Sequence, residues 1–176
     1  GRVPGVAQPS QKRFETLLAT RLAGFDLARP VFVEAESRRI GHVALPTPLL
    51  ERLRASPCVE IVASPAVRLD YLLRDYAYLG DEPEALAQTL GALRELQSKE
   101  TIARWQDWAR AGALAPLFAE LMARHYDPLY ARSQNSNYLR LQEAERVEAA
   151  SLAPDALPGL ARQVLRQVGA AVSSIP

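Results

Sequence analysis

Two acidic side chains and two arginines lie at the end of an apolar run, within residues 31–39. The carboxylates are Glu34 and Glu36, and Arg38 and Arg39 follow them. A carboxylate that ends a buried strand can orient magnesium-bound water or polarise a nucleophile, while adjacent arginines hold a transferred phosphate. Alternatively, the four charges pair with one another in a surface turn. Residue types alone lean toward this pairing and leave both interpretations open.

A second charged set lies on the helix predicted to begin at Ser64. Arg68 and Arg74 are six residues apart, so they point only partly in the same direction, and both could still face a phosphate. More often such arginines are solvated ion-pair partners of acids such as Asp75, and contribute little stability. Tyr76 could stack on a base, although aromatic residues at helical spacing are usually core.

Residues 125–130 bring a third set of polar and aromatic side chains together. An Asp-Pro turn after a helix, formed by Asp127, is expected to place His125 near Tyr126 and Tyr130. His125 could serve as a proton donor. Such a histidine more often marks a capped helix end.

Several motifs of established chemistry are missing from the sequence. It has no phosphate-cradling glycine loop followed by lysine and serine or threonine, and no GxSxG nucleophile turn. Neither His42 nor His125 has a paired cysteine or serine at a recognisable spacing. Cys58 is the sole cysteine, so it can form no internal disulfide, and no cluster offers a zinc site. A hydrolase is disfavoured, and no structural metal is expected.

The elements that position these residues alternate between strand and helix. Short apolar runs predict strands at 30–34 and 58–63. Cap-and-proline signals at Thr47 and Ser64 predict helices that follow each strand. This alternation favours an α/β fold with a parallel sheet, whose ligand sites lie beyond the carboxyl ends of its strands. Glu34 and Arg38 are expected at such an end.

The middle of the chain is helical by its apolar spacing. Residues 81–123 predict a helical insert that opens with an acidic capping box. A helix also precedes the first strand and is expected to end near Gly24. A last strand at 146–150 precedes a final helix.

Composition is that of an ordinary globular protein. The 176 residues are 48% hydrophobic and 23% charged, which is enough for one core, so 1–176 is expected to form a single domain. No apolar run is long enough to span a membrane and no secretory leader is visible, so a cytoplasmic protein with no membrane partner is expected. The first residue is Gly1 rather than methionine, which suggests a fragment.

Arginine dominates the basic residues. Of 21 basic residues only Lys12 and Lys99 are lysine, and the net charge is +1. Arginine binds phosphate through a planar fork, which suits nucleotide or RNA. Codon bias explains the same composition, and the acids nearly balance the bases, so charge alone decides nothing.

Four segments carry distinctive sequence blocks, at residues 8–15 (QPSQKRFE), 29–41 (RPVFVEAESRRIG), 72–80 (LLRDYAYLG) and 125–130 (HYDPLY). Together they resemble the tRNA 2-selenouridine synthase family, and they occur in the family's order. Members of that family join a rhodanese-like domain, which carries a reactive cysteine, to a P-loop domain with a Walker-type glycine loop. This chain shows neither feature, and Cys58 does not match the rhodanese cysteine loop.

The resemblance implies part of a P-loop-NTPase-like parallel sheet flanked by helices, without the rhodanese domain or the Walker A loop. The implied reaction replaces sulfur by selenium in the wobble 2-thiouridine of tRNA. Selenophosphate and geranyl diphosphate are the implied co-substrates, a geranylated species is the intermediate, and magnesium is possible. Partners are tRNA and the missing segments, and the fragment alone is not expected to be competent.

The resemblance also suggests roles for the candidate residues. Glu34 and Glu36 are the catalytic candidates. The candidates for binding phosphate or tRNA are Arg38, Arg39, Arg68, Arg74, Gln8, Ser10 and Gln11. The remaining candidates are Ser37, Asp75, Tyr76, His125, Tyr126, Asp127 and Tyr130.

Two other functions stay open. The alternating strands also suit a small-molecule kinase-like nucleotide-binding domain, which the missing glycine loop disfavours. The chain could instead be a noncatalytic tRNA-binding or domain-interface module. A missing strand is expected to leave a sheet edge and apolar surface unpaired, which favours association or low stability.

Overall fold

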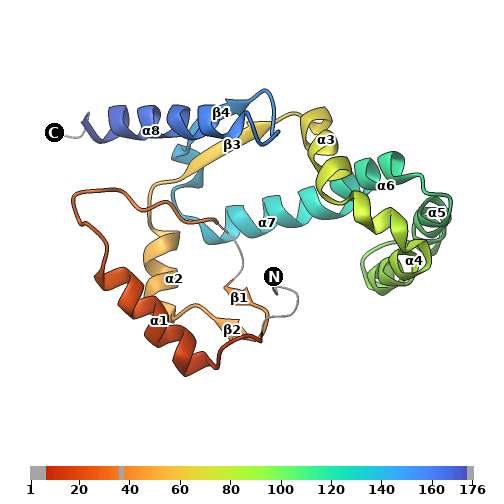
Figure 1. Cartoon of the computed structure of the whole chain (residues 1–176), viewed down its shortest axis with the longest axis horizontal. Helices are drawn as coiled ribbons and strands as arrows, with labels where there is room; N and C mark the ends of the chain where they lie inside the picture. The colour runs from red at the N-terminus through yellow and green to blue at the C-terminus, as the bar shows by residue number, and fades with distance from the viewer. Residues whose placement is uncertain (1–6, 36–37, 174–176) are drawn as a thin grey trace.

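The computed structural model of the chain describes residues 7–35 and 38–173 (Figure 1). A small parallel sheet with one helix beside it lies at one side of the view, and a cluster of helices lies at the other, with a long helix between them. The α-helices are α1 (Gln11–Ala23), α2 (Thr47–Arg54), α3 (Pro65–Asp75), α4 (Pro83–Gly91), α5 (Lys99–Arg110), α6 (Leu114–Leu121), α7 (Asp127–Asn137) and α8 (Leu157–Ser173). The strands are β1 (Arg39–Ile40), β2 (Val43–Ala44), β3 (Val59–Ala63) and β4 (Glu145–Ala149). The short turns of helix are η1 (Ala77–Asp81), η2 (Ala92–Glu95), η3 (Met122–Tyr126) and η4 (Leu141–Glu143).

The strands form two separate two-stranded sheets. Strands β1 and β2 are antiparallel, and β3 and β4 are parallel, with Val59 opposite Glu145 and Ala63 opposite Ala149. The predicted strands at 58–63 and 146–150 are therefore confirmed, and so is a helix-rich α/β fold. The chain between β3 and β4 supplies the crossover that parallel strands require.

The predicted strand at 30–34 is wrong for this structure. Residues 30–35 carry no strand assignment, and Val31, Phe32 and Val33 are 49%, 49% and 57% exposed. β-type side chains favour a strand only where a neighbouring strand supplies backbone partners and packing. Glu34 consequently does not end a sheet strand here, and Arg38 follows residues outside the described part.

Serine side chains cap the N-termini of three helices, and the cap at Ser64 was predicted from the sequence. The hydroxyls of Ser10, Ser64 and Ser98 accept hydrogen bonds from backbone N–H groups three residues later, at 3.4, 3.3 and 3.2 Å. Two other predicted starts differ. Helix α2 begins at Thr47 itself without a side-chain cap, and α4 begins at Pro83 without the predicted capping box.

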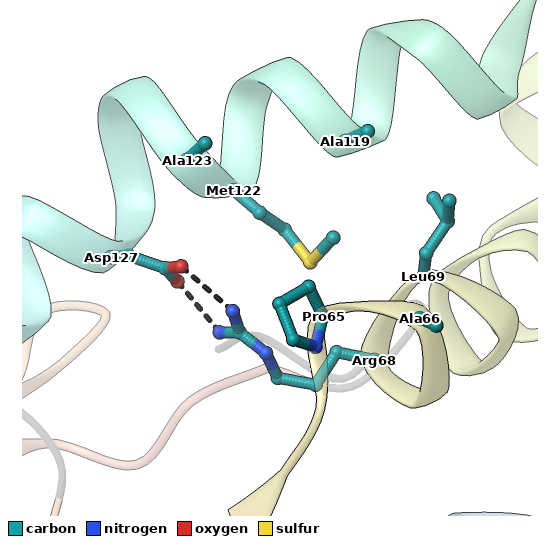
Figure 2. A pocket seen from close by; sticks show the side chains of 8 residues that line it. All are labelled: Pro65, Ala66, Arg68, Leu69, Ala119, Met122, Ala123 and Asp127. Atoms are coloured by element: carbon teal, nitrogen blue, oxygen red, sulfur yellow. Dashed lines mark hydrogen bonds and ion pairs between the residues drawn. The ribbon is translucent and has the colours of Figure 1, made fainter.

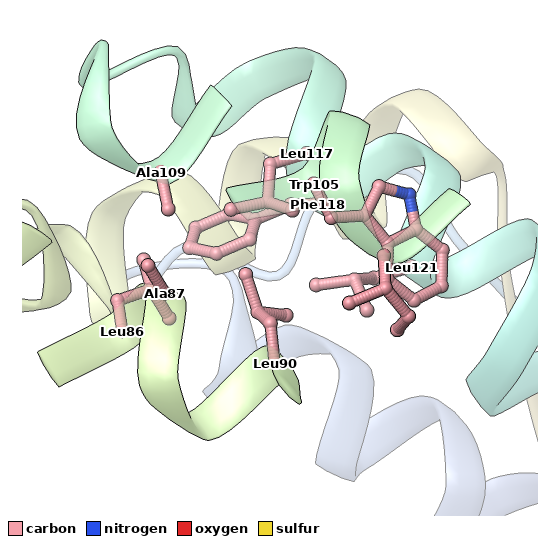
Figure 3. Close-up of a cluster of buried hydrophobic side chains, with 9 residues drawn as sticks. Leu86, Ala87, Leu90, Trp105, Ala109, Leu117, Phe118 and Leu121 are labelled. Carbon is pink, nitrogen blue, oxygen red and sulfur yellow. The ribbon is translucent and has the colours of Figure 1, made fainter. Parts of the chain in front are cut away.

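The largest buried cluster lies in the predicted helical insert. Helices α4, α5 and α6 bring their apolar faces together, with Trp105 and Leu117 fully buried (Figure 3). Removing this much apolar surface from water makes the cluster the main source of stability in the described chain. Its members are Leu86, Ala87, Leu90, Ile102, Trp105, Ala109, Leu117, Phe118 and Leu121.

Glu120 joins α5 to α6 at the border of this cluster. It accepts hydrogen bonds from Trp105 Nε1 at 2.8 Å and from Arg104 Nη2 at 2.6 Å, and Arg124 lies 3.0 Å away. Burial raises the pKa of Glu120, but these hydrogen bonds and cationic charges outweigh burial and hold it below its usual value. The buried indole N–H is thereby satisfied.

The predicted turn at Asp127–Pro128 is also wrong. Helix α6 runs through the π-helical turn η3 into α7, and Pro128 lies in the first turn of α7. Inside a continuous helix a proline removes a backbone hydrogen bond, and Pro128 lies two residues after the π-helical turn, where the regular hydrogen-bond pattern is already interrupted. The continuation places Asp127 against α3. Over residues 7–35 and 38–173, no helix has the length and apolar character needed to cross a membrane.

Candidate functional site

Helix α3 begins directly at the carboxyl end of β3, where parallel sheets usually bind ligands. The cap at Ser64 and the proline at 65 start the helix at once, so Arg68 lies within its first turns. Its guanidinium points away from α3 toward α7 (Figure 2). The end of β3 thus positions an arginine at the sheet edge.

Arg68 and Asp127, two of the predicted site residues, meet in a two-pronged ion pair. Nη1 and Nη2 of Arg68 each donate to one carboxylate oxygen of Asp127, both at 2.7 Å. The hydrogen bond to Asp127 raises the pKa of Arg68, although burial opposes it. The side chains are 35% and 40% exposed, and Arg68 Nε is buried without a hydrogen-bond partner in the described chain. An oxyanion can take this paired geometry in place of the carboxylate.

A cavity of about 200 Å³ opens beside the Arg68–Asp127 pair. Its walls are mainly apolar, and the Arg68–Asp127 pair supplies the charged part of the lining (Figure 2). This arrangement places a charged pair and apolar side chains around the same space. The lining residues are Pro65, Ala66, Arg68, Leu69, Ala119, Met122, Ala123 and Asp127.

Arg74, further along α3, connects the helix to the end of the neighbouring strand. Its Nη2 donates to the carbonyl of Leu152, after β4, at 3.0 Å, and its Nε donates to Asp75 at 3.1 Å. The guanidinium also lies 5.5 Å from the ring centre of Tyr71. A hydrogen bond to Asp75 is the main cause that raises the pKa of Tyr71. The carboxyl ends of both parallel strands therefore meet α3.

The aromatic candidates lie on η3, on α7 and at the C-terminal end of α3. His125 is buried in η3 and packs edge-on against Tyr126, with 4.9 Å between ring centres. Tyr76 is 40% exposed and lies 6.1 Å from Tyr78, while Tyr130 is 46% exposed on α7. His125 lies inside a continuous helix rather than at the helix end that the sequence suggested.

Gln8 and Gln11 hold the β1–β2 hairpin against the start of α1. Gln8 donates to the carbonyl of Ile40 at 2.8 Å and accepts from the N–H of His42 at 3.1 Å. Gln11 makes the same two kinds of bond with Ala44, at 2.8 and 2.9 Å. Both amides thus act as partners for strand backbone. Their predicted binding to phosphate or tRNA remains a prediction, as does that of the capping Ser10.

The structure describes only part of the charged segment at residues 34–39. Glu34 is exposed, and Arg38 donates to the hydroxyl of Thr47 at 3.4 Å. Arg39 lies on β1. Glu36 and Ser37 lie outside the described residues. Within residues 7–35 and 38–173, no group of three acidic, histidine or cysteine side chains is placed to hold a metal ion.

Two features of the described structure had no counterpart in the sequence interpretation. The Arg68–Asp127 pair spans 59 residues, so no local spacing could indicate it. The Glu120 cluster could have been predicted, because Glu120 is an acidic residue in the otherwise apolar helix α6. Burial raises the pKa of the Cys58 thiol, which disfavours the reactive thiolate.

The family described as the tRNA 2-selenouridine synthase AAA domain matches residues 1–99. The tRNA 2-selenouridine synthase of Alcanivorax borkumensis is 30% identical over 158 residues, which cover 74% of this chain and 43% of the relative. That of Bdellovibrio bacteriovorus is 31% identical over 156 residues, or 84% of this chain and 37% of the relative. That of Nitrosomonas europaea is 40% identical over 74 residues, or 40% of this chain and 19% of the relative.

The chain spans less than half the length of these relatives. No solved structure matches it. The family match runs from the first residue through β3, α3 and α4, so it includes Arg68 and Arg74 at the sheet edge. The chain therefore belongs to the tRNA 2-selenouridine synthase AAA domain family.

Proposed function

We propose that this chain is part of an enzyme that replaces sulfur by selenium in the wobble 2-thiouridine of tRNA. Selenophosphate is the proposed selenium donor, and the route passes through a geranylated intermediate made from geranyl diphosphate. The family match over residues 1–99 carries the proposal. We further propose that the chain forms one P-loop-like domain with a helical insert. Because its sequence lacks a phosphate-cradling glycine loop, the chain alone is proposed to bind substrate without turning it over.

The distribution of charge supports a polyanionic substrate. Residues 1–54 contain nine basic and five acidic side chains, a net charge of +4, whereas residues 55–176 carry −3. A basic surface attracts RNA and releases its counterions on binding. Arg38 and Arg39, both exposed, belong to the basic part. They are the proposed contacts with the tRNA backbone.

Arg68 and Arg74 are the proposed phosphate ligands at the sheet edge. In the described structure the guanidinium of Arg68 donates two hydrogen bonds to Asp127. A phosphate presents the same pair of oxygens, so substrate binding is proposed to exchange Asp127 for phosphate at Arg68. Asp127 then keeps this half-buried cation neutralised when no substrate is present.

Glu34 and Glu36 remain the proposed catalytic carboxylates. Glu34 is exposed, and the described residues offer it no metal-binding cluster. Glu36 lies outside the described residues, and the proposed task of the two carboxylates is to organise neighbouring arginines or a magnesium ion.

The test compares two double variants that remove the same charge. Arg38→Ala with Arg39→Ala should weaken binding to a tRNA carrying wobble 2-thiouridine. The slope of log affinity against log salt should fall by about 1 for each phosphate that the protein no longer neutralises. Arg110→Ala with Arg140→Ala is the control, because those arginines lie in residues 55–176, the part of the chain with a net charge of −3. Equal reductions in affinity for both variants would show a general charge effect and refute the assigned roles.

A further inference from the structure

A cleft of about 400 Å³ lies between the end of α1 and the loop that follows it. Figure 1 shows this loop leaving α1 on the side away from helices α4, α5 and α6. Small-molecule sites usually have volumes of about 300–1,000 Å³. The cleft is within that range, whereas the cavity beside Arg68 has only about 200 Å³. The chemistry of the cleft comes from Arg21, Phe25, Asp26, Arg29 and Phe32.

Short-range hydrogen bonds hold the turns that carry these side chains. The N–H of Phe25 donates to the carbonyl of Leu22 at 3.2 Å, in the turn that ends α1. Asp26 then accepts twice within its own turn. Its carbonyl accepts from the N–H of Arg29 at 3.1 Å, and its carboxylate accepts from the N–H of Ala28 at 2.9 Å. These bonds fix where Phe25 and Arg29 leave the backbone.

Two arginines make the cleft positive. Arg21 and Arg29 are both exposed, and neither forms an ion pair within residues 7–35 and 38–173. Asp26 is the acidic residue of the lining, so the lining carries a net charge of +1. Arg68 and Arg74, by contrast, are both ion-paired. The cleft therefore offers two guanidinium groups to an anion such as a phosphate.

Two phenylalanines supply aromatic faces beside these arginines. The guanidinium of Arg21 lies over the ring of Phe25, 5.3 Å from its centre. This contact uses the flat face of the guanidinium and leaves the N–H groups at its edge for an anion. Phe32 also lines the cleft and is 49% exposed, so part of its ring is open to a further planar group.

We infer that this cleft binds a nucleotide unit, with the phosphate at Arg21 and Arg29 and the base against Phe32. An inorganic anion would use the arginines alone, and a hydrocarbon would use the phenylalanines alone. A nucleotide uses both, because every base has an aromatic face that stacks on such rings. The unit comes from a free nucleoside monophosphate or from an unpaired residue of RNA. The inference goes beyond the proposed function, since it needs neither selenium chemistry nor the phosphate site at Arg68.

Nuclear magnetic resonance titration of this chain tests the inference. The probes are uridine 5′-monophosphate, ribose 5-phosphate, which lacks the base, and uridine, which lacks the phosphate. Uridine 5′-monophosphate should shift the backbone amides of Phe25, Arg29 and Phe32. It should bind at least about fivefold more tightly than either fragment, because stacking and the charged hydrogen bonds each contribute that much. Equal affinity for uridine 5′-monophosphate and either fragment would overturn the inference.

Matched variants assign the two halves of the ligand. Phe32→Leu should weaken binding of uridine 5′-monophosphate about fivefold and leave that of ribose 5-phosphate unchanged. Phe14→Leu, on α1 outside the lining, should change neither. Arg21→Gln and Arg29→Gln should each weaken both phosphates, whereas Arg13→Gln, exposed on α1 outside the lining, should not. Equal losses in a variant and its control would refute the assigned contacts.

The amides of His42 and Ala44 report whether each variant keeps its fold, because they donate to Gln8 and Gln11 at the start of α1. A single-stranded oligouridylate distinguishes the two sources of the nucleotide. Tighter binding than uridine 5′-monophosphate at the same amides identifies RNA, and equal or weaker binding identifies the free nucleotide. Shifts confined to residues outside the cleft would overturn the inference for both sources.

Discussion

Arg68 and Asp127 are joined by two hydrogen bonds of 2.7 Å although 59 residues separate them in sequence. The pair connects the helix that follows β3 to the first residue of α7. The whole helical insert lies between these two residues in the chain. The Arg68–Asp127 ion pair therefore joins the residues on either side of the helical insert, at the proposed phosphate site.

The contribution of this pair to stability should be measurable by a double-mutant cycle. Both side chains are about a third or more exposed, so the coupling between Arg68→Ala and Asp127→Ala should be about 0.5–1 kcal/mol. Urea denaturation of the four proteins gives the value. Strictly additive effects of the two substitutions would show that the pair adds no stability.

The same pair predicts a gain in RNA affinity. Asp127→Asn removes the anion that competes with phosphate for Arg68, so this variant should bind tRNA more tightly at low salt than the unmodified chain does. Arg68→Ala should weaken binding. Fluorescence anisotropy with labelled tRNA measures both. Weaker binding by the Asp127→Asn variant would contradict the exchange of Asp127 for phosphate.

Shortening a side chain in the core of the helical insert should lower stability far more than the same change at the surface. Leu117→Ala should lower the free energy of unfolding by about 2–5 kcal/mol, because the side chain is fully buried among α4, α5 and α6. Leu96→Ala makes the same chemical change at a side chain that is 60% exposed, and should cost less than about 0.5 kcal/mol. Similar midpoints for the two variants in urea would contradict the position of the core.

Glu120 predicts a loss of stability in acid. Its pKa is lower in the folded chain than in the unfolded chain, so the ionised carboxylate stabilises the fold above the unfolded pKa. That stability is lost as the pH falls below the ordinary glutamate pKa of about 4.3 and through the lower folded pKa. Glu120→Gln should flatten this part of the stability curve.

The control for this titration is Glu143→Gln, at a side chain that is 64% exposed beside Arg140. Its curve should run parallel to that of the unmodified chain. Urea midpoints at intervals of pH give both curves. A Glu120→Gln curve as steep as the unmodified one would show that another group causes the destabilisation in acid.

Alanine substitutions at two glycines with the same backbone conformation distinguish backbone strain from steric crowding. Gly41 and Gly112 have φ values of 65° and 67°, so alanine is strained at both. A Cβ at Gly41 would also clash with the side-chain amide of Gln8, whereas nothing lies within 4 Å at Gly112. Gly41→Ala must therefore displace the Gln8 amide from the hairpin.

We expect Gly41→Ala to cost about 1 kcal/mol more than Gly112→Ala, which is the net value of the displaced hydrogen bonds. Thermal unfolding, with hydrogen exchange at Ile40 and His42, measures the difference. Equal costs would mean that Gln8 contributes no stability to the hairpin.

Local signals predicted much of the fold. Ser64 followed by proline identifies a helix start from interactions within four residues. The strand at 58–63 was recognisable from its apolar run. The strand predicted at 30–34 failed because pairing depends on a neighbour, which the sequence of the segment does not encode.

The candidate site was predictable as a set of residue types, but its geometry was not. Arg68 and Asp127 were both identified, whereas their pairing depends on how α7 continues from α6. The Asp-Pro signal concealed that continuation, since Asp-Pro is typical of a turn and proline is uncommon inside a continuous helix. Gln8 and Gln11 bind hairpin backbone, a role that requires knowing where the hairpin lies.

The most direct test of the proposed function is salt-dependent binding of this chain to three RNAs. They are a tRNA carrying wobble 2-thiouridine, the same tRNA without the modification, and an unrelated RNA of equal length. The account predicts preferential binding of the modified tRNA, with affinity falling as salt rises. Equal affinity for all three RNAs, or no binding at low salt, would contradict recognition of substrate by this chain.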